Sequence, residues 1–172
     1  MLSVIIPTYN RSEILKETIK SFIHLKHNRN DFSYEIIVVD NNSQDNTENV
    51  VLSFKNRLPI YYLFEKKQGK SYALNTGIKK ANGSIFVFVD DDVTVAPNWL
   101  TCIYKSLNLY KNINTFGGKI LTLWPENTPE WAIYSSTNFP FLFSNLDLGS
   151  EDTLFKTRFP GGANFWVRAH LI

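Results

Sequence analysis

The 172-residue sequence has little cysteine, little net charge and no long apolar run, and each shortage excludes a class of protein. A single cysteine, Cys102, cannot form a disulfide within the chain and fits a reducing compartment. Lys and Arg number 18 and Asp and Glu 16, so the net charge of +2 does not indicate a nucleic-acid partner. The longest purely apolar run, residues 85–89, is far shorter than the ~20 residues that a membrane-spanning helix needs.

The first residues do not have the pattern of a secretory signal, because residues 1–4 carry no basic segment and Pro7 follows closely. We therefore expect a soluble, cytoplasmic protein, with the inner face of the membrane as an alternative location. The hydrophobic content of 44% is enough for a core and too high for disorder. At about 150 residues per domain, the length predicts a single domain.

Short apolar runs alternate with segments of helical period along the first 121 residues. The runs predict strands at residues 4–6, 36–39, 60–64, 85–89 and 115–121. Between them, apolar residues recur three and four positions apart, which is typical of one face of a helix. All-apolar strands are typical of a parallel sheet that is covered on both faces. The expected fold is an open, Rossmann-like α/β sheet, mostly parallel, with helices on both faces.

Two details of the expected helices depend on single residues. Asn10 or Ser12 is expected to cap the first helix, and Asn10 with Glu13 resembles a capping box. Cys102 is expected on the buried apolar face of the helix that begins near Pro97.

Polar residues follow three of the expected strands at the point where each strand ends. They occupy positions 8–11, 40–43 and 90–92. Ligands of open α/β sheets bind outside the carboxyl ends of the strands, so these residues predict a binding site at that edge. Asp40 could accept a hydrogen bond there from a ribose hydroxyl or a base N–H. The alternative for Asp40 is a turn residue that bonds to nearby backbone.

Three consecutive carboxylates, Asp90, Asp91 and Asp92, repel one another at the end of a buried strand. A divalent cation removes this cost, and Mg²⁺ and Mn²⁺ prefer oxygen ligands that they share with substrate phosphates. In an extended segment Asp90 and Asp92 point to the same side. This pair is therefore the predicted metal site, and a solvated acidic turn is the alternative.

The periodicity fades after residue 121. Aromatic residues lie scattered among polar ones, for example Trp124, Trp131, Phe139, Phe141 and Phe143. Long irregular segments are usually functional or disordered, and this one is too aromatic for disorder. We expect residues 122–160 to pack on the ligand edge and partly cover it. The aromatic rings could contact the sugars of an acceptor, or a membrane that carries a lipid-linked acceptor, or form the underside of a covering loop.

Four ordered motifs resemble those of family 2 glycosyltransferases, which have the GT-A fold. They are VIIPTYNR at 4–11, IVVDNNSQDNT at 37–47, GKSYALNTGI at 69–78 and FVFVDDD at 86–92. A later segment, GGAN at 161–164 followed by Arg168, is similar to the part of the family near the acceptor site.

The resemblance implies a nucleotide-activated sugar as donor and a glycan or lipid-linked acceptor. The nucleotide could be that of uridine, guanosine or deoxythymidine, and a UDP-sugar is preferred because a hydrogen-bond acceptor at Asp40 suits uracil. It divides the domain into a nucleotide-sugar-binding core, residues 1–121, and an incomplete acceptor-side segment, residues 122–172. The implied nucleotide-binding residues are Pro7, Thr8, Tyr9, Arg11, Asp40, Asn42, Lys70, Asp90 and Asp91. The implied ligands of Mn²⁺ or Mg²⁺ are Asp92 and Asp90, and the acceptor side holds Gly161, Gly162, Ala163 and Asn164.

The resemblance also implies an inverting enzyme in which a carboxylate, as general base, deprotonates the acceptor hydroxyl. In the family this base follows the GGAN segment, but residues 165–172 contain neither Asp nor Glu. We expect a truncated catalytic domain whose base lies beyond Ile172. Asp152 is the remaining candidate within the chain, although it precedes Gly161.

Two other functions share some of these residues. A partial domain without the base would bind the nucleotide and not transfer the sugar. A haloacid-dehalogenase-like phosphatase would use Asp90 of the pattern Asp90-x-Asp92-x-Thr94 as its nucleophile. That family needs its motif on an early strand, whereas here the motif follows the fourth.

Overall fold

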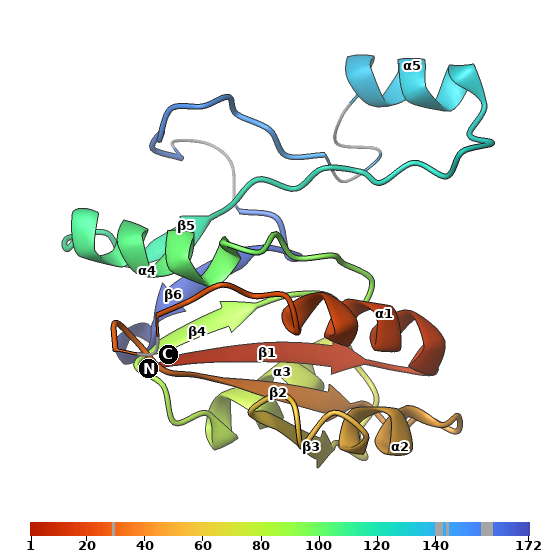
Figure 1. Ribbon diagram of the computed structural model, residues 1–172, viewed down its shortest axis with the longest axis vertical. Helices are drawn as coiled ribbons and strands as arrows, with labels where there is room; N and C mark the ends of the chain where they lie inside the picture. The colour runs from red at the N-terminus through yellow and green to blue at the C-terminus, as the bar shows by residue number, and fades with distance from the viewer. Residues whose placement is uncertain (29, 140–142, 144, 156–159) are drawn as a thin grey trace.

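The computed structural model describes residues 1–28, 30–139, 143, 145–155 and 160–172. Within these residues the chain forms one six-stranded sheet and five α-helices (Figure 1). The strands are β1 (Leu2–Thr8), β2 (Tyr34–Asp40), β3 (Ile60–Phe64), β4 (Ile85–Phe88), β5 (Thr115–Gly117) and β6 (Phe165–Arg168). The helices are α1 (Ser12–Phe22), α2 (Thr47–Leu52), α3 (Lys70–Lys80), α4 (Trp99–Leu109) and α5 (Glu130–Asn138).

The sheet has the order β3-β2-β1-β4-β6-β5. The first four of these strands are parallel, and β6 runs antiparallel to both of its neighbours. This confirms the predicted mostly parallel α/β sheet. Thr8 at the end of β1 lies beside Asp40 at the end of β2, so the carboxyl ends of the parallel strands meet at one edge.

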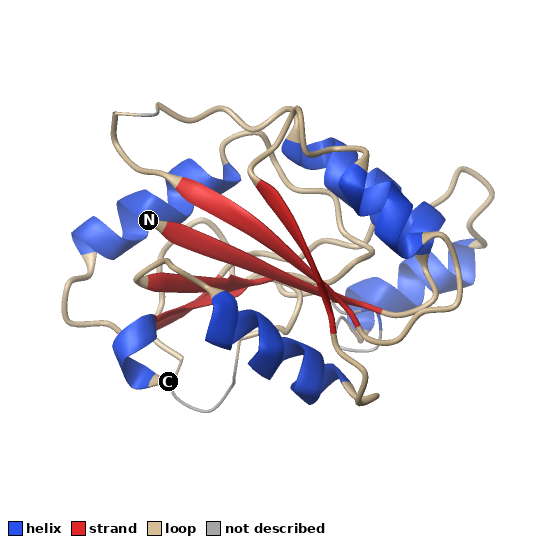
Figure 2. Ribbon diagram, turned by 90° about the horizontal axis from the view of Figure 1, so that it is seen from below, coloured by secondary structure: helices blue, strands red, loops and turns tan. Residues whose placement is uncertain are grey.

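Helices cover both faces of the sheet, as predicted (Figure 2). Apolar residues of α1, α2 and α4 form one buried cluster with one face of the strands. Residues of α3 form a second cluster with the other face. A Cβ atom on Gly77 of α3 would lie 2.6 Å from Cγ2 of Ile5 in β1, so only glycine allows the helix to approach the sheet this closely. This contact seats α3, whose first residue is Lys70, directly on the sheet.

The sequence did not predict β6. Residues 165–168 belong to the expected acceptor-side segment, yet they pair with β4 and β5 inside the sheet. Trp166 and Val167 are buried, and Trp166 stacks on Phe116 of β5 with ring centroids 5.6 Å apart. The predicted strand at 115–121 is in turn shorter, because β5 ends at Gly117. Four-residue and three-residue strands are too short to show a reliable period.

The predicted cap of α1 is wrong. The residue before the helix is Arg11, which makes no capping bond, and Asn10 has a left-handed backbone with φ of 51°. Oδ1 of Asn10 accepts instead from the backbone N–H of Gln44 at 2.7 Å. The cap comes from the loop after β2, where Oδ2 of Asp45 accepts from the backbone N–H of Ser12 at 2.8 Å. Capping across two loops leaves no local sequence pattern.

The prediction that Cys102 is buried is also wrong. The buried face of α4 consists of Trp99, Leu100, Ile103 and Leu107, and Cys102 lies outside it and is exposed. At the end of α4, the guanidinium of Arg168 donates to the backbone oxygens of Leu107 and Ile113, both at 2.9 Å. These bonds connect the end of α4 to β6, so the contacts of Arg168 are structural.

The segment after β5 leads away from the sheet and carries α5 at its far end (Figure 1). An isolated antiparallel bridge between Ile120 and Leu146 joins the part of this segment that leads towards α5 to the part that returns from it. Trp131 and Tyr134 of α5 are 68% and 71% exposed. Phe141, one of the aromatic residues singled out in the sequence, lies outside the described residues.

Among the described residues, no helix is both long enough and apolar enough to cross a membrane.

Candidate functional site

A pocket of about 430 Å³ lies at the carboxyl ends of β1 and β4, beside the first turn of α3. Loops that are far apart in the sequence form its walls. The lining residues are Pro7, Thr8, Tyr9, Arg11, Asn41, Gln68, Gly69, Lys70, Asp90, Asp91 and Asp92. The structure therefore gathers most of the residues expected to bind the nucleotide or a metal, and the exceptions are Asp40 and Asn42.

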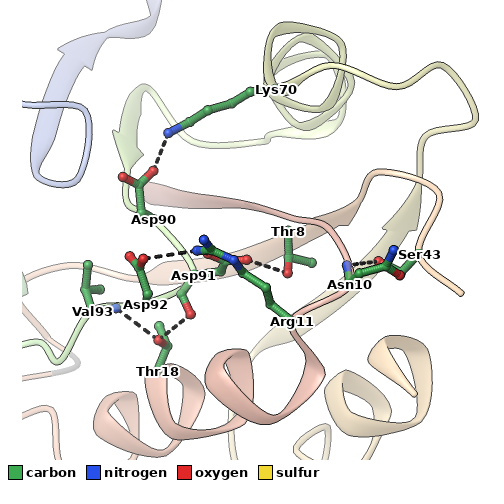
Figure 3. Close-up of polar contacts among 10 residues, drawn as sticks. All are labelled: Thr8, Asn10, Arg11, Thr18, Ser43, Lys70, Asp90, Asp91, Asp92 and Val93. Atoms are coloured by element: carbon green, nitrogen blue, oxygen red, sulfur yellow. Dashed lines mark hydrogen bonds and ion pairs between the residues drawn. The ribbon is translucent and has the colours of Figure 1, made fainter. Parts of the chain in front are cut away.

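The three aspartates do not continue β4. The strand ends at Phe88, and Asp91 and Asp92 lie in a turn. The alternation expected of an extended segment does not apply to a turn, and that argument for pairing Asp90 with Asp92 is wrong. Figure 3 shows Asp90 directed towards Lys70, while Asp91 and Asp92 both lie near Arg11.

Asp91 is the buried member of the triplet. Its Oδ2 accepts a hydrogen bond from the hydroxyl of Thr8 at 2.7 Å, and its Oδ1 lies 3.2 Å from Nη1 of Arg11. A buried carboxylate needs such partners, because an isolated charge is costly to remove from water. Asp91 therefore ties the turn after β4 to the end of β1.

Two cations neutralise part of the triplet. Nη1 of Arg11 lies 3.1 Å from Oδ2 of Asp92 as well as near Asp91, and Nζ of Lys70 pairs with Oδ1 of Asp90. The negative charge of Asp91 and its hydrogen bond raise the pKa of Arg11 above its usual value, and the charge and hydrogen bond of Asp92 add to this effect. Burial of the guanidinium opposes the rise. Three carboxylates against two cations leave a net charge of −1 in the pocket. This charge favours a further cation.

The donor set suits a hard divalent cation. Asp90 and Asp92 offer carboxylate oxygens in the same pocket, and the Asp92 side chain is 50% exposed. Within the described part of the chain, no group of three or more His, Cys, Asp or Glu residues could hold a metal. Magnesium-like ions are commonly held by one or two carboxylates, with water and substrate phosphates as the other ligands. Two carboxylates are therefore sufficient for a metal that the substrate helps to hold.

Asp40 lies behind the pocket wall. Its Oδ1 accepts from the backbone N–H of Ser43 and its Oδ2 from the hydroxyl of Tyr62, both at 2.8 Å. Burial and then the bond to Asp40 raise the pKa of Tyr62 well above its usual value. The turn role considered for Asp40 from the sequence is thus present in the structure.

The neighbouring Asn41, which the sequence placed at this edge without giving it a role of its own, reaches the pocket instead, and Gln68 and Gly69, which were not expected in the site, line it as well. Nδ2 of Asn41 donates to the backbone oxygen of Lys67, and its Oδ1 accepts from the backbone N–H of Gly69, both at 2.7 Å. These bonds hold the loop that leads into α3. The signal was available, because Asn41 stands in the same motif as Asp40.

A second, smaller pocket of about 230 Å³ shares Asp90 with the first. Its other lining residues are Ile120, Asn145, Leu146, Gly161, Gly162 and Ala163. Three of the four residues expected on the acceptor side therefore lie together. A Cβ atom on Gly162 would stand 4.0 Å from Nζ of Lys70, so Lys70 lies where the two pockets adjoin.

Asn164 does not line this pocket. Its Oδ1 accepts from the indole N–H of Trp99 and its Nδ2 donates to the backbone oxygen of Lys119, both at 3.0 Å. Asn164 thus fastens the end of the GGAN segment to α4 and to the chain that follows β5.

The structure does not bring Asp152, the candidate base, to either pocket. Its Oδ2 accepts from the hydroxyl of Tyr110 at 2.8 Å, just beyond the end of α4. Residues 122–160 were expected to cover the ligand edge, but among the residues of this range that the structure describes, only Asn145 and Leu146 line a pocket. The reason is that α5 extends away from the sheet (Figure 1).

Solved structures with the same arrangement of elements define the class of fold. Over 99% of this chain, TarS of S. aureus in complex with UDP superimposes with a TM-score of 0.75 at 21% identity, and the match covers 47% of TarS. The mannosyltransferase PcManGT of Pyrobaculum calidifontis, in complex with GDP-Man and Mn²⁺, superimposes with a TM-score of 0.68 at 21% identity, covering 99% of this chain and 45% of that one. The fold is the Rossmann-like GT-A fold of glycosyltransferases.

The family follows from the sequence comparison. The family model "Glycosyl transferase family 2" matches residues 3–163, and the chain belongs to this family. Glycosyltransferase AglE of Haloferax volcanii is 27% identical over 99% of this chain. The chain spans about half of that relative, 53% of its length.

Proposed function

We propose that this chain binds a nucleoside diphosphate sugar in the pocket at the ends of β1 and β4, and that the protein transfers the sugar to a hydroxyl acceptor with inversion. The observation that carries the proposal is the pocket itself. It combines the family motifs from four separate segments with three carboxylates and two cations. Membership of family 2 removes the phosphatase alternative, because the Asp90 pattern belongs to a glycosyltransferase motif here.

The proposed roles follow from position in the pocket. Pro7, Thr8 and Tyr9 form the wall for the base and ribose, and Asp90 lies where it could accept from a ribose hydroxyl. Arg11 and Lys70 are the cations that can turn from their carboxylates to the diphosphate. Asp40 and Asn42 contribute through the loop after β2, which they shape.

A divalent cation, Mn²⁺ or Mg²⁺, would stabilise the charge that develops on the leaving diphosphate. Asp92 and Asp90 are the residues proposed to hold it. PcManGT is described as binding Mn²⁺ with its nucleotide sugar, which supports the same use here. We favour UDP as the nucleotide, because TarS, with the same fold, is described in complex with UDP.

The second pocket is the proposed acceptor site. The small residues Gly161, Gly162 and Ala163 leave space beside Asp90 for an acceptor hydroxyl to approach the bound sugar. This arrangement divides the work between residues 1–121, which bind the donor, and residues 122–172, which line the acceptor side. A glycan or a lipid-linked glycan would meet the exposed aromatic residues of α5, and the lipid-linked form would bring the protein to the cytoplasmic face of a membrane.

The general base is the part of the proposal that the described residues do not supply. Apart from the triplet, no Asp or Glu among them lines either pocket. We propose that the base belongs to a longer protein and lies beyond Ile172. This observation also favours a second candidate function, in which these residues alone bind the nucleotide without transferring the sugar.

A thermal-shift panel tests the proposal. We expect one of UDP, GDP and dTDP to raise the Tm of the protein, and Mn²⁺ to increase the shift. Asp92→Ala should abolish only the increase that depends on Mn²⁺. Asp152→Ala is the matched control and should respond like the wild type, because Asp152 lies outside both pockets. The absence of any shift with all three nucleotides would refute the donor site.

A further inference from the structure

Thr18 is a polar residue on the buried face of α1, and its hydroxyl contacts the backbone on both sides of Asp92. The residue is 2% exposed. Its Oγ1 donates to the backbone oxygen of Asp91 at 2.7 Å and accepts from the backbone N–H of Val93 at 3.1 Å (Figure 3). The backbone oxygen of Asp91 belongs to the peptide bond before Asp92, and the backbone N–H of Val93 belongs to the peptide bond after it.

One hydroxyl therefore restrains the two peptide groups that flank Asp92. Peptide groups are planar, so fixing both of them restricts the φ and ψ angles of Asp92 and the direction of its side chain. The side chain of Asp92 has no comparable support, because it is 50% exposed and its ion pair is with the half-exposed Arg11. The turn also lies beyond the end of β4, where strand pairing no longer holds the backbone.

The next turn of α1 offers a comparison. The hydroxyl of Ser21 donates to the backbone oxygen of Thr18 at 2.7 Å and accepts from the backbone N–H of Val95 at 3.2 Å. Ser21 thus also holds the segment after β4, by one hydrogen bond where Thr18 makes two, and at a peptide bond that does not adjoin Asp92. If the hydroxyl of Thr18 only held this segment in place, Ser21 would share that role, and loss of either hydroxyl would weaken Mn²⁺ binding.

We propose that Thr18 is a positioning residue for the donor site, and that its hydroxyl aims the carboxylate of Asp92 at the divalent cation. The proposal rests on the proposed function of the pocket and adds a residue to it. Groups that orient a metal ligand typically change metal affinity 10-fold to 100-fold when they are removed. We expect an effect near the lower end, because Arg11 still contacts Asp92.

The experiment measures Mn²⁺ affinity by the electron paramagnetic resonance signal of free Mn²⁺, in the presence of saturating UDP. Thr18→Val keeps the shape of the side chain and removes the hydroxyl, and we expect it to weaken Mn²⁺ binding about 10-fold. UDP affinity without metal should stay the same. Thr18→Ser keeps the hydroxyl and should restore Mn²⁺ affinity. Ser21→Ala is the matched control and should bind Mn²⁺ like the wild type.

The outcomes separate the two proposals. Wild-type affinity in Thr18→Val, or an equal loss in Ser21→Ala, would overturn the role of Thr18 while leaving the donor site intact. Failure of the wild-type protein to bind UDP, GDP and dTDP, with or without Mn²⁺, would overturn the proposed function itself. Should Thr18→Val not fold, Thr18→Ala takes its place, because it removes the same hydroxyl, and Thr18→Ser again shows whether the hydroxyl restores Mn²⁺ affinity.

Discussion

At the scale of single residues, adjacent aspartates have three different environments. Asp91 is buried against Thr8, Asp92 is half-exposed beside Arg11, and Asp90 faces Lys70 where the two pockets adjoin. The sequence could predict that these carboxylates gather at the sheet edge, because strand ends locate them. It could not predict their partners, because the turn after Phe88 redirects Asp91 and Asp92.

Arg11 offers a prediction about charge. Arg11→Gln should weaken metal-free UDP binding several-fold, because the diphosphate loses a cation, and the loss should shrink as salt screens the interaction. The free energy of unfolding should also fall, by about 1 kcal/mol or more, because the substitution removes the cation from the buried carboxylate of Asp91 as well as from the half-exposed Asp92. Calorimetric titration with UDP at two salt concentrations measures the effect.

The control for Arg11 is Lys16→Gln on the same helix. Lys16 pairs with the exposed Glu13, and neither residue lines a pocket. The Lys16→Gln variant should therefore bind UDP with the affinity of the wild type. Equal UDP affinity of Arg11→Gln and the wild type at low salt would remove Arg11 from the site.

At the scale of secondary-structure elements, α1 is the helix that connects the site. Its first backbone N–H is capped by Asp45 from the loop after β2, and Thr18 and Ser21 hold the segment after β4. The period of its apolar residues predicted the helix, but not these polar contacts. Ser12 and Thr18 lie on the buried face of α1 among apolar residues, where the helical pattern predicts apolar side chains. These two polar positions are where the helix contacts the loops that form the pocket.

Asp45 offers a prediction about stability and pH. Hydrogen bonds from Thr47 and Ser12 outweigh the effect of burial and lower the pKa of Asp45 below its usual value. The stabilisation is therefore fully present above about pH 4, the ordinary pKa of an aspartate, and is lost as the pH falls through the lower pKa of the folded state. Asp45→Ala should cost about 1 kcal/mol of unfolding free energy at pH 7, which is typical of a lost helix cap.

Urea unfolding at pH 7 and at pH 3 measures this difference. The gap between wild type and Asp45→Ala should narrow at the lower pH, as the wild-type carboxylate becomes protonated. Asp31→Ala, in the exposed loop before β2, controls for the loss of one negative charge. A gap that stays constant between the two pH values would show that the ionised carboxylate is not the source of the stability.

At the scale of the whole molecule, the first four strands and their helices follow from sequence period, and the later part does not. β6 enters the sheet from residues 165–168, after the long excursion that carries α5. Such pairing between distant segments has no local signal. The excursion was expected to lie over the ligand edge because its sequence is irregular and rich in aromatic residues. Its return nevertheless has a functional result, because it brings Gly161 and Gly162 beside Asp90.

The two pockets thus join both parts of the chain at Asp90, and the central claim is that the larger one binds a nucleoside diphosphate with a divalent cation. The most direct measurement is calorimetric titration of the wild-type protein and Asp92→Asn with UDP, each with and without Mn²⁺. The account predicts that Mn²⁺ strengthens UDP binding to the wild type by about 10-fold or more, as is typical of two coupled ligands, and that Asp92→Asn binds UDP equally weakly in both conditions. A wild-type protein that binds none of UDP, GDP and dTDP, or a full Mn²⁺ effect in Asp92→Asn, would contradict it.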